Sequence, residues 1–161
     1  MTESQNKTLT PDEAENIAQT AQMNGKKIVL AGGCFDILHL GHILFLKKAK
    51  QQGDLLFLFL ESDENIKRLK GSNRPINTQD DRARALSALP SVDYIIKLPK
   101  LPTDKDYDRL IAQIKPDVIA VTEGDPNLAK REDQASRVGG KVKSVTRRTK
   151  YSTTDKIAQL K

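Results

Sequence analysis

The chain has 161 residues, of which 37% are hydrophobic, so it is long enough to bury the core of one domain. Its one cysteine excludes a disulfide framework and suits a reducing compartment. The net charge of +6 is concentrated in residues 141–150, which carry five basic and no acidic side chains. This distribution favours a local polyphosphate site or a solvated edge over the broad basic face of a nucleic-acid-binding protein. An aromatic content of 4% also leaves few side chains for base stacking.

The sequence shows no targeting or membrane segment. Residues 1–7 lack the apolar stretch of a signal peptide, and the longest apolar run, residues 55–60, is far too short to span a bilayer. We therefore expect a cytoplasmic protein.

Helices and strands alternate along the sequence. Thr10 to Glu13 form a capping box with proline at the first helical position, which predicts a helix that runs to about residue 22 and stops near Asn24 and Gly25. Strands are expected at about 27–31, 54–60, 94–96, 118–121 and 141–145, and further helices at about 41–51, 63–69, 78–88, 104–114, 126–137 and from about 152. The near-continuous apolar run at 54–60 predicts a strand buried on both faces.

This alternation predicts an α/β fold: a doubly wound, mostly parallel five-stranded sheet of Rossmann-like type with helices on both faces. Ligands of such sheets bind beyond the carboxyl ends of the strands, where the winding reverses. Neither a Walker A sequence nor a G-x-G-x-x-G follows the strand at 27–31, which argues against a P-loop kinase or a dinucleotide dehydrogenase.

The segment Gly32 to His42 follows this first strand and opens the next helix. Its glycines permit a close approach by a ligand, and the unpaired N–H groups and the dipole of a helix N-terminus favour a bound phosphate. A metal site has little support here, because the chain has no third histidine and Cys34 is most simply a small buried residue. Asp36 with both histidines would crowd three ligands into seven residues.

His39-Leu40-Gly41-His42 matches the H-x-G-H signature, and the whole segment resembles that of the HIGH-type nucleotidyltransferases. These enzymes move a nucleoside monophosphate from a nucleoside triphosphate onto a phosphate or similar acceptor. Residues 66–76, 80–82 and 88–94 resemble the middle of the heptose 1-phosphate adenylyltransferases of the HldE and HldC type, and residues 151–157 resemble their second signature, a Ser/Thr-rich turn that opens the final helix.

The resemblance covers residues 10–161 and implies one nucleotidyltransferase domain over residues 1–161. Residues 1–9 are expected to be flexible, residues 10–24 to form the N-terminal helix, and residues 26–161 to form the catalytic core.

The resemblance also implies the site. Catalytic roles fall on His39, His42, Lys70 and Arg82, with Lys70 and Arg82 contacting phosphate or acceptor. Nucleotide binding is expected from Gly32, Gly33, Cys34, Phe35, Asp36, His39, Gly41, His42, Glu123, Gly124, Asp125, Tyr151, Ser152, Thr153 and Thr154. Ser152, Thr153 and Thr154 would hold the triphosphate, which would itself carry Mg²⁺, and no protein metal ligand is expected.

Each later segment also has a purely structural interpretation. Lys70 and Arg74 would then be exposed loop charges, and Arg82 would be a helix-surface residue that pairs with Asp80 or Asp81. The turn at 152–154 would be an ordinary helix cap.

The resemblance implies transfer of AMP from ATP to a heptose 1-phosphate in ADP-heptose and lipopolysaccharide biosynthesis, without nucleic-acid or membrane partners. Two departures keep the base and the acceptor open: Gly33 replaces the usual Asn, and Glu123-Gly124-Asp125 replaces Gly-Gly-Asp. The Gly-Gly opening also resembles archaeal-type FAD synthetases, and residues 152–154 are equally close to glycerol 3-phosphate cytidylyltransferase. A nucleotide-binding regulatory protein is the non-enzymatic alternative. The oligomeric state stays open, with a homodimer as one arrangement.

Overall fold

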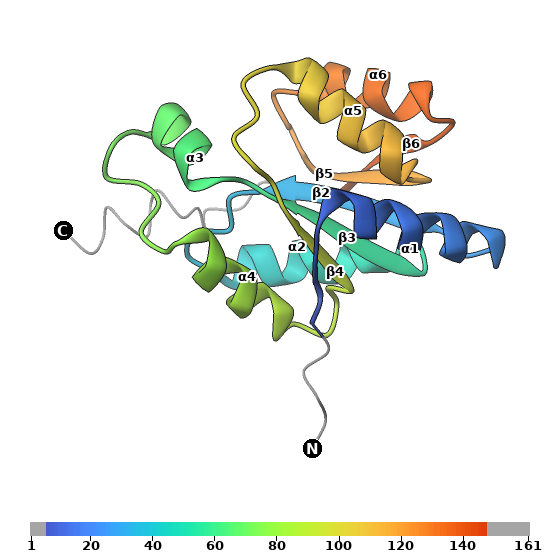
Figure 1. Ribbon diagram of the computed structural model, residues 1–161, viewed down its shortest axis with the longest axis horizontal. Helices are drawn as coiled ribbons and strands as arrows, with labels where there is room; N and C mark the ends of the chain where they lie inside the picture. The colour runs from blue at the N-terminus through green and yellow to red at the C-terminus, as the bar shows by residue number, and fades with distance from the viewer. Residues whose placement is uncertain (1–5, 148–161) are drawn as a thin grey trace.

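Six parallel strands form one sheet in the computed structural model, which describes residues 6–147 (Figure 1). The strands are β1 (Thr8–Leu9), β2 (Ile28–Gly33), β3 (Leu55–Leu60), β4 (Tyr94–Lys97), β5 (Val118–Glu123) and β6 (Lys141–Arg147). Their order across the sheet is β1-β4-β3-β2-β5-β6. The chain therefore builds β2, β3 and β4 toward one edge and then crosses back to place β5 and β6 on the other side of β2. The winding reverses between β2 and β5, and this is the point where such sheets bind ligands.

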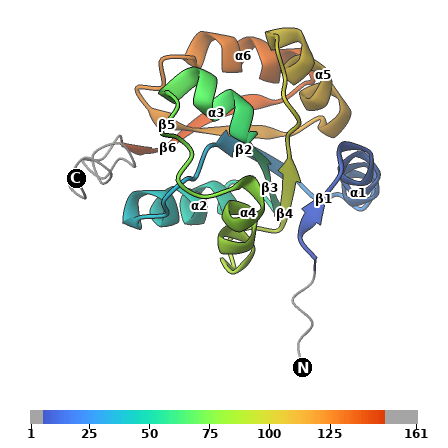
Figure 2. The same cartoon turned by 60° about the vertical axis from the view of Figure 1, so that its left-hand side comes forward.

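Helices cover both faces of the sheet (Figures 1 and 2). They are α1 (Pro11–Met23), α2 (Leu40–Lys50), α3 (Asp63–Lys70), α4 (Gln79–Ser87), α5 (Asp104–Ile114) and α6 (Leu128–Arg137). The first, fifth and sixth helices share one apolar core, which includes Ile28, Phe57 and Ile119 of the strands. The second and fourth pack against the opposite core, which includes Val29 and Leu58. Because neighbouring strand residues point to opposite faces, β2 and β3 contribute to both cores and must be apolar almost throughout.

The predicted parallel α/β sheet with helices on both faces is confirmed, but the expected number of five strands is wrong for the part of the chain that the structure describes. The additional strand is β1, in which Thr8 pairs with Ile95 and Leu9 pairs with Ile96 of β4. Two residues are too few to show an alternating pattern, so the sequence carries no local signal for this strand. The helix expected from about residue 152 lies outside the described residues.

Local sequence accounts for the start of several helices. Thr10 accepts a hydrogen bond from the Glu13 backbone N–H, and the Glu13 side chain accepts one from the Thr10 N–H, so the predicted capping box is formed. Ser62 and Thr78 cap α3 and α4 in the same way through their hydroxyl groups. Within residues 6–147, every helix falls short of the length and apolar character needed to cross a membrane.

Candidate active site

The loop between β2 and α2 lies at the carboxyl end of β2, beside the reversal point of the sheet, where both histidines were predicted. His39 is the N-cap of α2, with φ −139° and ψ 175°, and His42 lies in the first turn of that helix. Their rings stack with centroids 3.9 Å apart and an interplanar angle of 20°. Both imidazoles therefore stand at the positive end of the α2 dipole, next to N–H groups that the helix itself leaves unpaired.

Phe35 is the buried aromatic residue of this loop and packs against His42. It adopts a left-handed conformation (φ 48°), its side chain is buried, and its ring meets the His42 ring edge-on with centroids 5.4 Å apart. A Cβ on Gly33 would lie 3.0 Å from Phe35 Cε2, closer than nine in ten real Cβ contacts. Glycine at position 33 therefore leaves room for the Phe35 ring, which in turn contacts His42.

Burial controls the charge of His42. Desolvation, followed by the positive charges of His39 and Lys70, lowers the pKa of His42 from 6.5 to about 4, while a hydrogen bond with the Ile37 backbone acts in the opposite direction. His42 is therefore neutral at neutral pH. Its Nδ1 atom is buried and has no hydrogen-bond partner among residues 6–147, so the described fold leaves this nitrogen unused.

Asp36 fixes the loop instead of facing solvent. Its carboxylate accepts hydrogen bonds from Arg74 Nε (2.8 Å) and from the backbone N–H groups of Ile76 (2.9 Å) and Asn77 (2.9 Å). The Asn77 side chain donates back to the Asp36 carbonyl at 2.6 Å. Burial raises the pKa of Asp36, but these hydrogen bonds outweigh it and bring the pKa below the usual value. The structure thus uses this expected nucleotide-binding residue to tie the histidine loop to residues 74–77.

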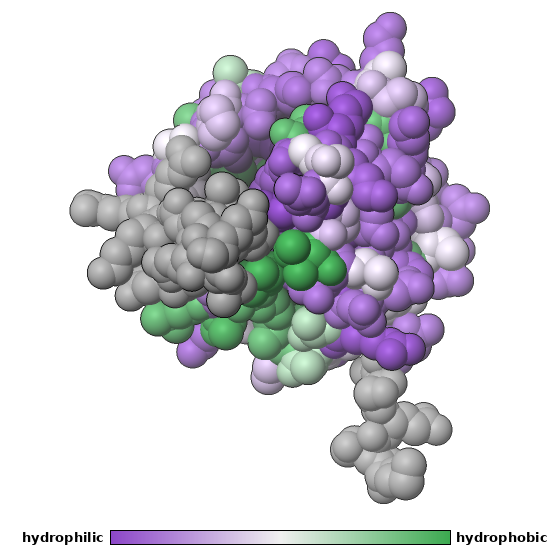
Figure 3. Space-filling model, turned by 90° about the vertical axis from the view of Figure 1, so that its left-hand side faces the viewer, coloured by the Kyte–Doolittle hydropathy of each residue, from purple (hydrophilic) through white to green (hydrophobic). Residues whose placement is uncertain are grey.

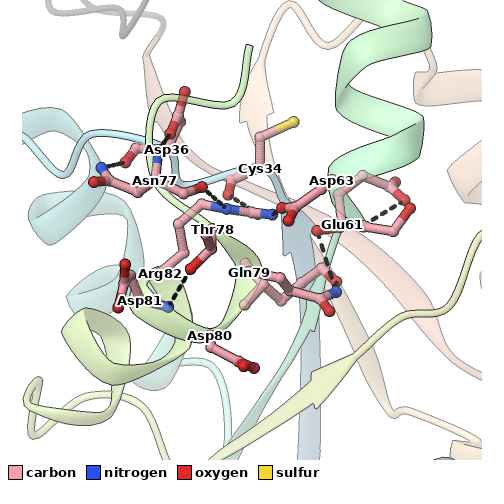
Figure 4. Close-up of polar contacts among 12 residues, drawn as sticks. Cys34, Asp36, Glu61, Asp63, Asn77, Thr78, Gln79, Asp80, Asp81 and Arg82 are labelled. Atoms are coloured by element: carbon pink, nitrogen blue, oxygen red, sulfur yellow. Dashed lines mark hydrogen bonds and ion pairs between the residues drawn. The ribbon is translucent and has the colours of Figure 1, made fainter.

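Arg82 is also buried, with only 1% of its surface exposed. Its Nε donates to the Asn77 carbonyl (3.1 Å), its Nη1 to the Cys34 carbonyl (2.7 Å), and its Nη2 to Asp63 Oδ1 (2.6 Å), as Figure 4 shows. All three guanidinium nitrogens therefore already donate to protein oxygens. One side chain joins the starts of α3 and α4 to the histidine loop.

The interpretation of Arg82 as a surface residue paired with Asp80 or Asp81 is therefore wrong. Asp80 instead pairs with Lys97 at 2.7 Å, and the Asp81 N–H caps onto the Thr78 hydroxyl. Arg74, read in the same interpretation as an exposed loop charge, is buried, with 6% of its surface exposed.

Lys70 ends α3 and is exposed, yet its charge reaches the histidine loop. It helps to lower the pKa of His42, and it opposes the burial that raises the pKa of the Cys34 thiol. Cys34 is therefore protonated at neutral pH, and its carbonyl rather than its thiol makes the contact with Arg82. An anion in front of the histidines would have the Lys70 ammonium as a nearby positive charge.

The second expected part of the nucleotide site follows β5. Glu123 ends that strand, and Gly124 turns the chain with φ 80°, a conformation that favours glycine. Asp125 Oδ1 then accepts a hydrogen bond from the Asn127 N–H just before α6. Because β5 runs parallel to β2 and pairs with it, this turn and the histidine loop both lie at the carboxyl ends of the strands. The expected residues Tyr151, Ser152, Thr153 and Thr154 lie outside the described residues.

Exposed apolar side chains lie next to these charged groups. Leu40, Ile43 and Leu44 of α2 are 55%, 36% and 42% exposed, and Ile76, beside Asp36, is 55% exposed. Figure 3 views this end of the molecule and shows hydrophobic residues bordered by hydrophilic ones. The face that carries the histidines is therefore partly apolar.

Sequence reasoning missed the residues that hold the site together. Two of them, Arg74 and Asn77, bind Asp36 of the histidine loop, and Asp63 binds Arg82. In addition, Gln79 Nε2 donates to the carbonyls of Leu60 and Leu98 at the ends of β3 and β4. The partners of these residues lie 19 to 41 positions away in the chain, so no local pattern marks them. The one available signal was Asp36, because a carboxylate in a buried loop requires donors.

The sequence model of the cytidylyltransferase-like family matches residues 30–158. The bifunctional protein HldE of Wolinella succinogenes is 47% identical over 117 residues, which cover 73% of this chain and 24% of that protein. HldE of Geobacter metallireducens is 40% identical over 152 residues, which cover 92% of this chain and 30% of that protein. The chain thus spans less than a third of the length of these relatives.

Two solved structures are similar to most of this chain. The lipopolysaccharide core biosynthesis protein of Thermoplasma volcanium matches with a TM-score of 0.61 and 31% identity, covering 80% of this chain and 100% of that one. Pantoate-β-alanine ligase of Francisella tularensis, solved with β,γ-ATP and β-alanine, matches with a TM-score of 0.63 and 17% identity over 93% of this chain and 72% of that one. At that identity the ligase shows the shared fold alone.

The low pKa of His42 predicts how stability depends on pH. Between about pH 6.5 and pH 4 the unfolded chain binds a proton at this site that the folded chain does not, so stability falls as the pH drops. We expect His42→Gln to remove about 2 kcal/mol of the loss between neutral pH and about pH 4.5. Urea unfolding at both pH values measures this. Lys48→Gln, an exposed change on the same helix, is the control, and identical losses in wild type and His42→Gln would contradict the burial of a neutral His42.

Proposed function

The chain belongs to the cytidylyltransferase-like family of nucleotidyltransferases, and we propose that it transfers AMP from ATP to a sugar phosphate of the heptose 1-phosphate type, with release of pyrophosphate. The observation that carries this proposal is the stacked pair His39 and His42 at the N-terminus of α2, at the point where the sheet reverses. This arrangement is suited to binding and stabilising a polyphosphate.

The proposed reaction needs no covalent enzyme intermediate. An oxygen of the acceptor phosphate attacks the α-phosphorus of the triphosphate in line, a new P–O bond forms, and the bond to the β-phosphate oxygen breaks. A phosphate monoester has a second pKa of about 6, so it is largely a dianion at neutral pH and requires no general base. The protein then acts by positioning two anions and by stabilising the charge that moves onto pyrophosphate.

The site offers donors for this task. The free N–H groups at the start of α2, the imidazoles of His39 and His42, and the exposed ammonium of Lys70 all lie at one end of the sheet. His42 is neutral in the free protein, and a nearby triphosphate favours its protonated form, which would let Nδ1 donate to a phosphate oxygen. Binding and proton uptake are then coupled at this ring.

Mg²⁺ enters this proposal with the nucleotide. No group of three His, Cys, Asp or Glu side chains within residues 6–147 could hold a metal ion, and the one buried carboxylate of the loop, Asp36, is bound by three N–H groups of the protein. Mg²⁺ typically keeps several waters and binds substrate phosphates. Bound to the triphosphate oxygens, it would neutralise charge on the leaving pyrophosphate.

The choice of ATP and a heptose phosphate rests on similarity. The similarity to the HldE relatives and to the lipopolysaccharide core biosynthesis protein favours an acceptor from lipopolysaccharide core biosynthesis. Discrimination between bases would come from groups around Glu123, Gly124 and Asp125, because a wrong base would leave the polar groups that it covers there unpaired.

A panel of nucleotides and acceptors tests the proposal. Pyrophosphate release is measured for ATP, CTP, GTP and UTP, each with D-glycero-D-manno-heptose 1-phosphate, glycerol 3-phosphate or FMN. We expect the highest kcat/KM for ATP with the heptose phosphate. A preference for CTP, or turnover only with glycerol 3-phosphate or FMN, would defeat this substrate assignment and leave nucleotidyl transfer standing. ATP binding without turnover for any acceptor would indicate a regulatory nucleotide-binding protein.

The histidine assignment predicts a large effect on turnover. Removal of one preorganised donor to developing charge typically costs roughly 10² to 10³ in kcat, so we expect a loss of this size in His42→Ala. The ring is only half-buried, so folding should be nearly intact. Steady-state kinetics at saturating substrates measure the effect, with the exposed Lys48→Ala as control. An unchanged kcat would remove His42 from the mechanism.

A further inference from the structure

Arg74 has a buried N–H donor, at Nη2, that makes no hydrogen bond within residues 6–147. Its side chain is 7% exposed, and its Nε donates to Asp36 Oδ2 at 2.8 Å. Its Nη2, in contrast, is buried and has no hydrogen-bond partner among residues 6–147. A buried guanidinium N–H without an acceptor costs free energy, so such a group needs an explanation.

Asp36 does not accept a hydrogen bond from Arg74 Nη2. Its Oδ1 already accepts from the N–H groups of Ile76 and Asn77, and its Oδ2 accepts from Arg74 Nε and again from Ile76. Three N–H groups thus occupy the two oxygens, with the Ile76 N–H shared between both, and Arg74 Nη2 is not one of these donors. The remaining Arg74 donor has to be satisfied from outside this cluster.

Arg82 provides the contrast within the same chain. It is buried even more deeply than Arg74, but each of its three nitrogens donates to a protein oxygen. Of these two buried arginines, Arg82 has a protein partner at every guanidinium nitrogen, whereas Arg74 Nη2 has none among residues 6–147. A ligand contact is thus more consistent with Arg74 than with Arg82, although the family resemblance implied a contact from Arg82.

The surroundings of Arg74 suit an anion. Asp36 follows directly after Phe35, whose ring contacts His42, so the ion pair is formed by a residue of the same loop that carries the histidines. His42 Nδ1 is a second buried polar atom of this loop that lacks a partner among the described residues. Lys70, four residues before Arg74, adds an exposed positive charge that acts on His42.

We propose that Arg74 is a substrate-binding residue that donates from Nη2 to a phosphate oxygen. The inference rests on the proposed function, since the phosphate belongs to one of its two substrates, the nucleoside triphosphate or the sugar phosphate. The ion pair with Asp36 holds the guanidinium in place, so its second edge is oriented before the ligand arrives. Through Arg74, the loop at 70–77 would contact the phosphate of the substrate directly.

The test uses Arg74→Lys, which keeps the positive charge but replaces the guanidinium fork with one ammonium group that cannot occupy the Nε and Nη2 positions together. Inorganic tripolyphosphate, binding to which is measured by calorimetry, is the probe for the nucleotide arm. Heptose 1-phosphate is the probe for the acceptor arm. One charge-assisted hydrogen bond corresponds to roughly a 10- to 100-fold change in Kd, and we expect this loss for one of the two probes. The exposed Arg84→Lys, on α4, is the matched control and should leave both Kd values unchanged.

Weaker binding of tripolyphosphate alone supports the proposal and assigns the contact to the nucleotide, and weaker binding of heptose 1-phosphate alone assigns it to the acceptor. Wild-type Kd values for both probes overturn the proposal. If Arg74→Lys does not fold, Arg74→Gln, whose amide can still donate to Asp36, replaces it with the same expected losses. Failure of the proposed function is seen separately, because inactive wild-type protein in the acceptor panel leaves the tripolyphosphate measurement intact.

Discussion

The buried carboxylate of Asp36 is the constraint on which the site depends. An ionised group in an apolar interior is costly unless donors surround it, and here four hydrogen bonds from Arg74, Ile76 and Asn77 do so. These donors come from a segment about forty residues further along the chain. Their hydrogen bonds to the buried carboxylate therefore hold that segment against the histidine loop. Arg82 adds contacts with the Cys34 and Asn77 carbonyls, so both sides of the loop are fixed.

This arrangement separates the groups that hold the site from those that can act on a ligand. Both carboxylate oxygens of Asp36 and all three guanidinium nitrogens of Arg82 are bound to protein groups. His42 Nδ1 and Arg74 Nη2 lack partners within residues 6–147, and Lys70 is exposed. Preorganised polar groups of this kind need little rearrangement when charge develops, which is the main requirement of phosphoryl and nucleotidyl transfer.

Much of the fold could be predicted because its signals are local. The apolar runs of β2 and β3 reflect burial on both faces, the Thr10 capping box marks the start of α1, and the position of the histidines follows from a strand that leads into a helix. The partners of Asp36 and Arg82 could not be predicted, because their contacts span 38 and 48 residues and depend on the folded topology. The same holds for β1, whose two residues are a strand only because β4 lies beside them.

The central claim is that Asp36 anchors the loop so that the histidines, and not the carboxylate, face the triphosphate. A crystal structure of the protein with Mg²⁺ and a non-hydrolysable ATP analogue tests it most directly. The account predicts a triphosphate oxygen within hydrogen-bond distance, about 2.7–3.2 Å, of His42 Nδ1, with Asp36 still bound to Arg74, Ile76 and Asn77. A triphosphate bound away from the start of α2, or an Asp36 carboxylate turned toward the nucleotide or its metal, would contradict it.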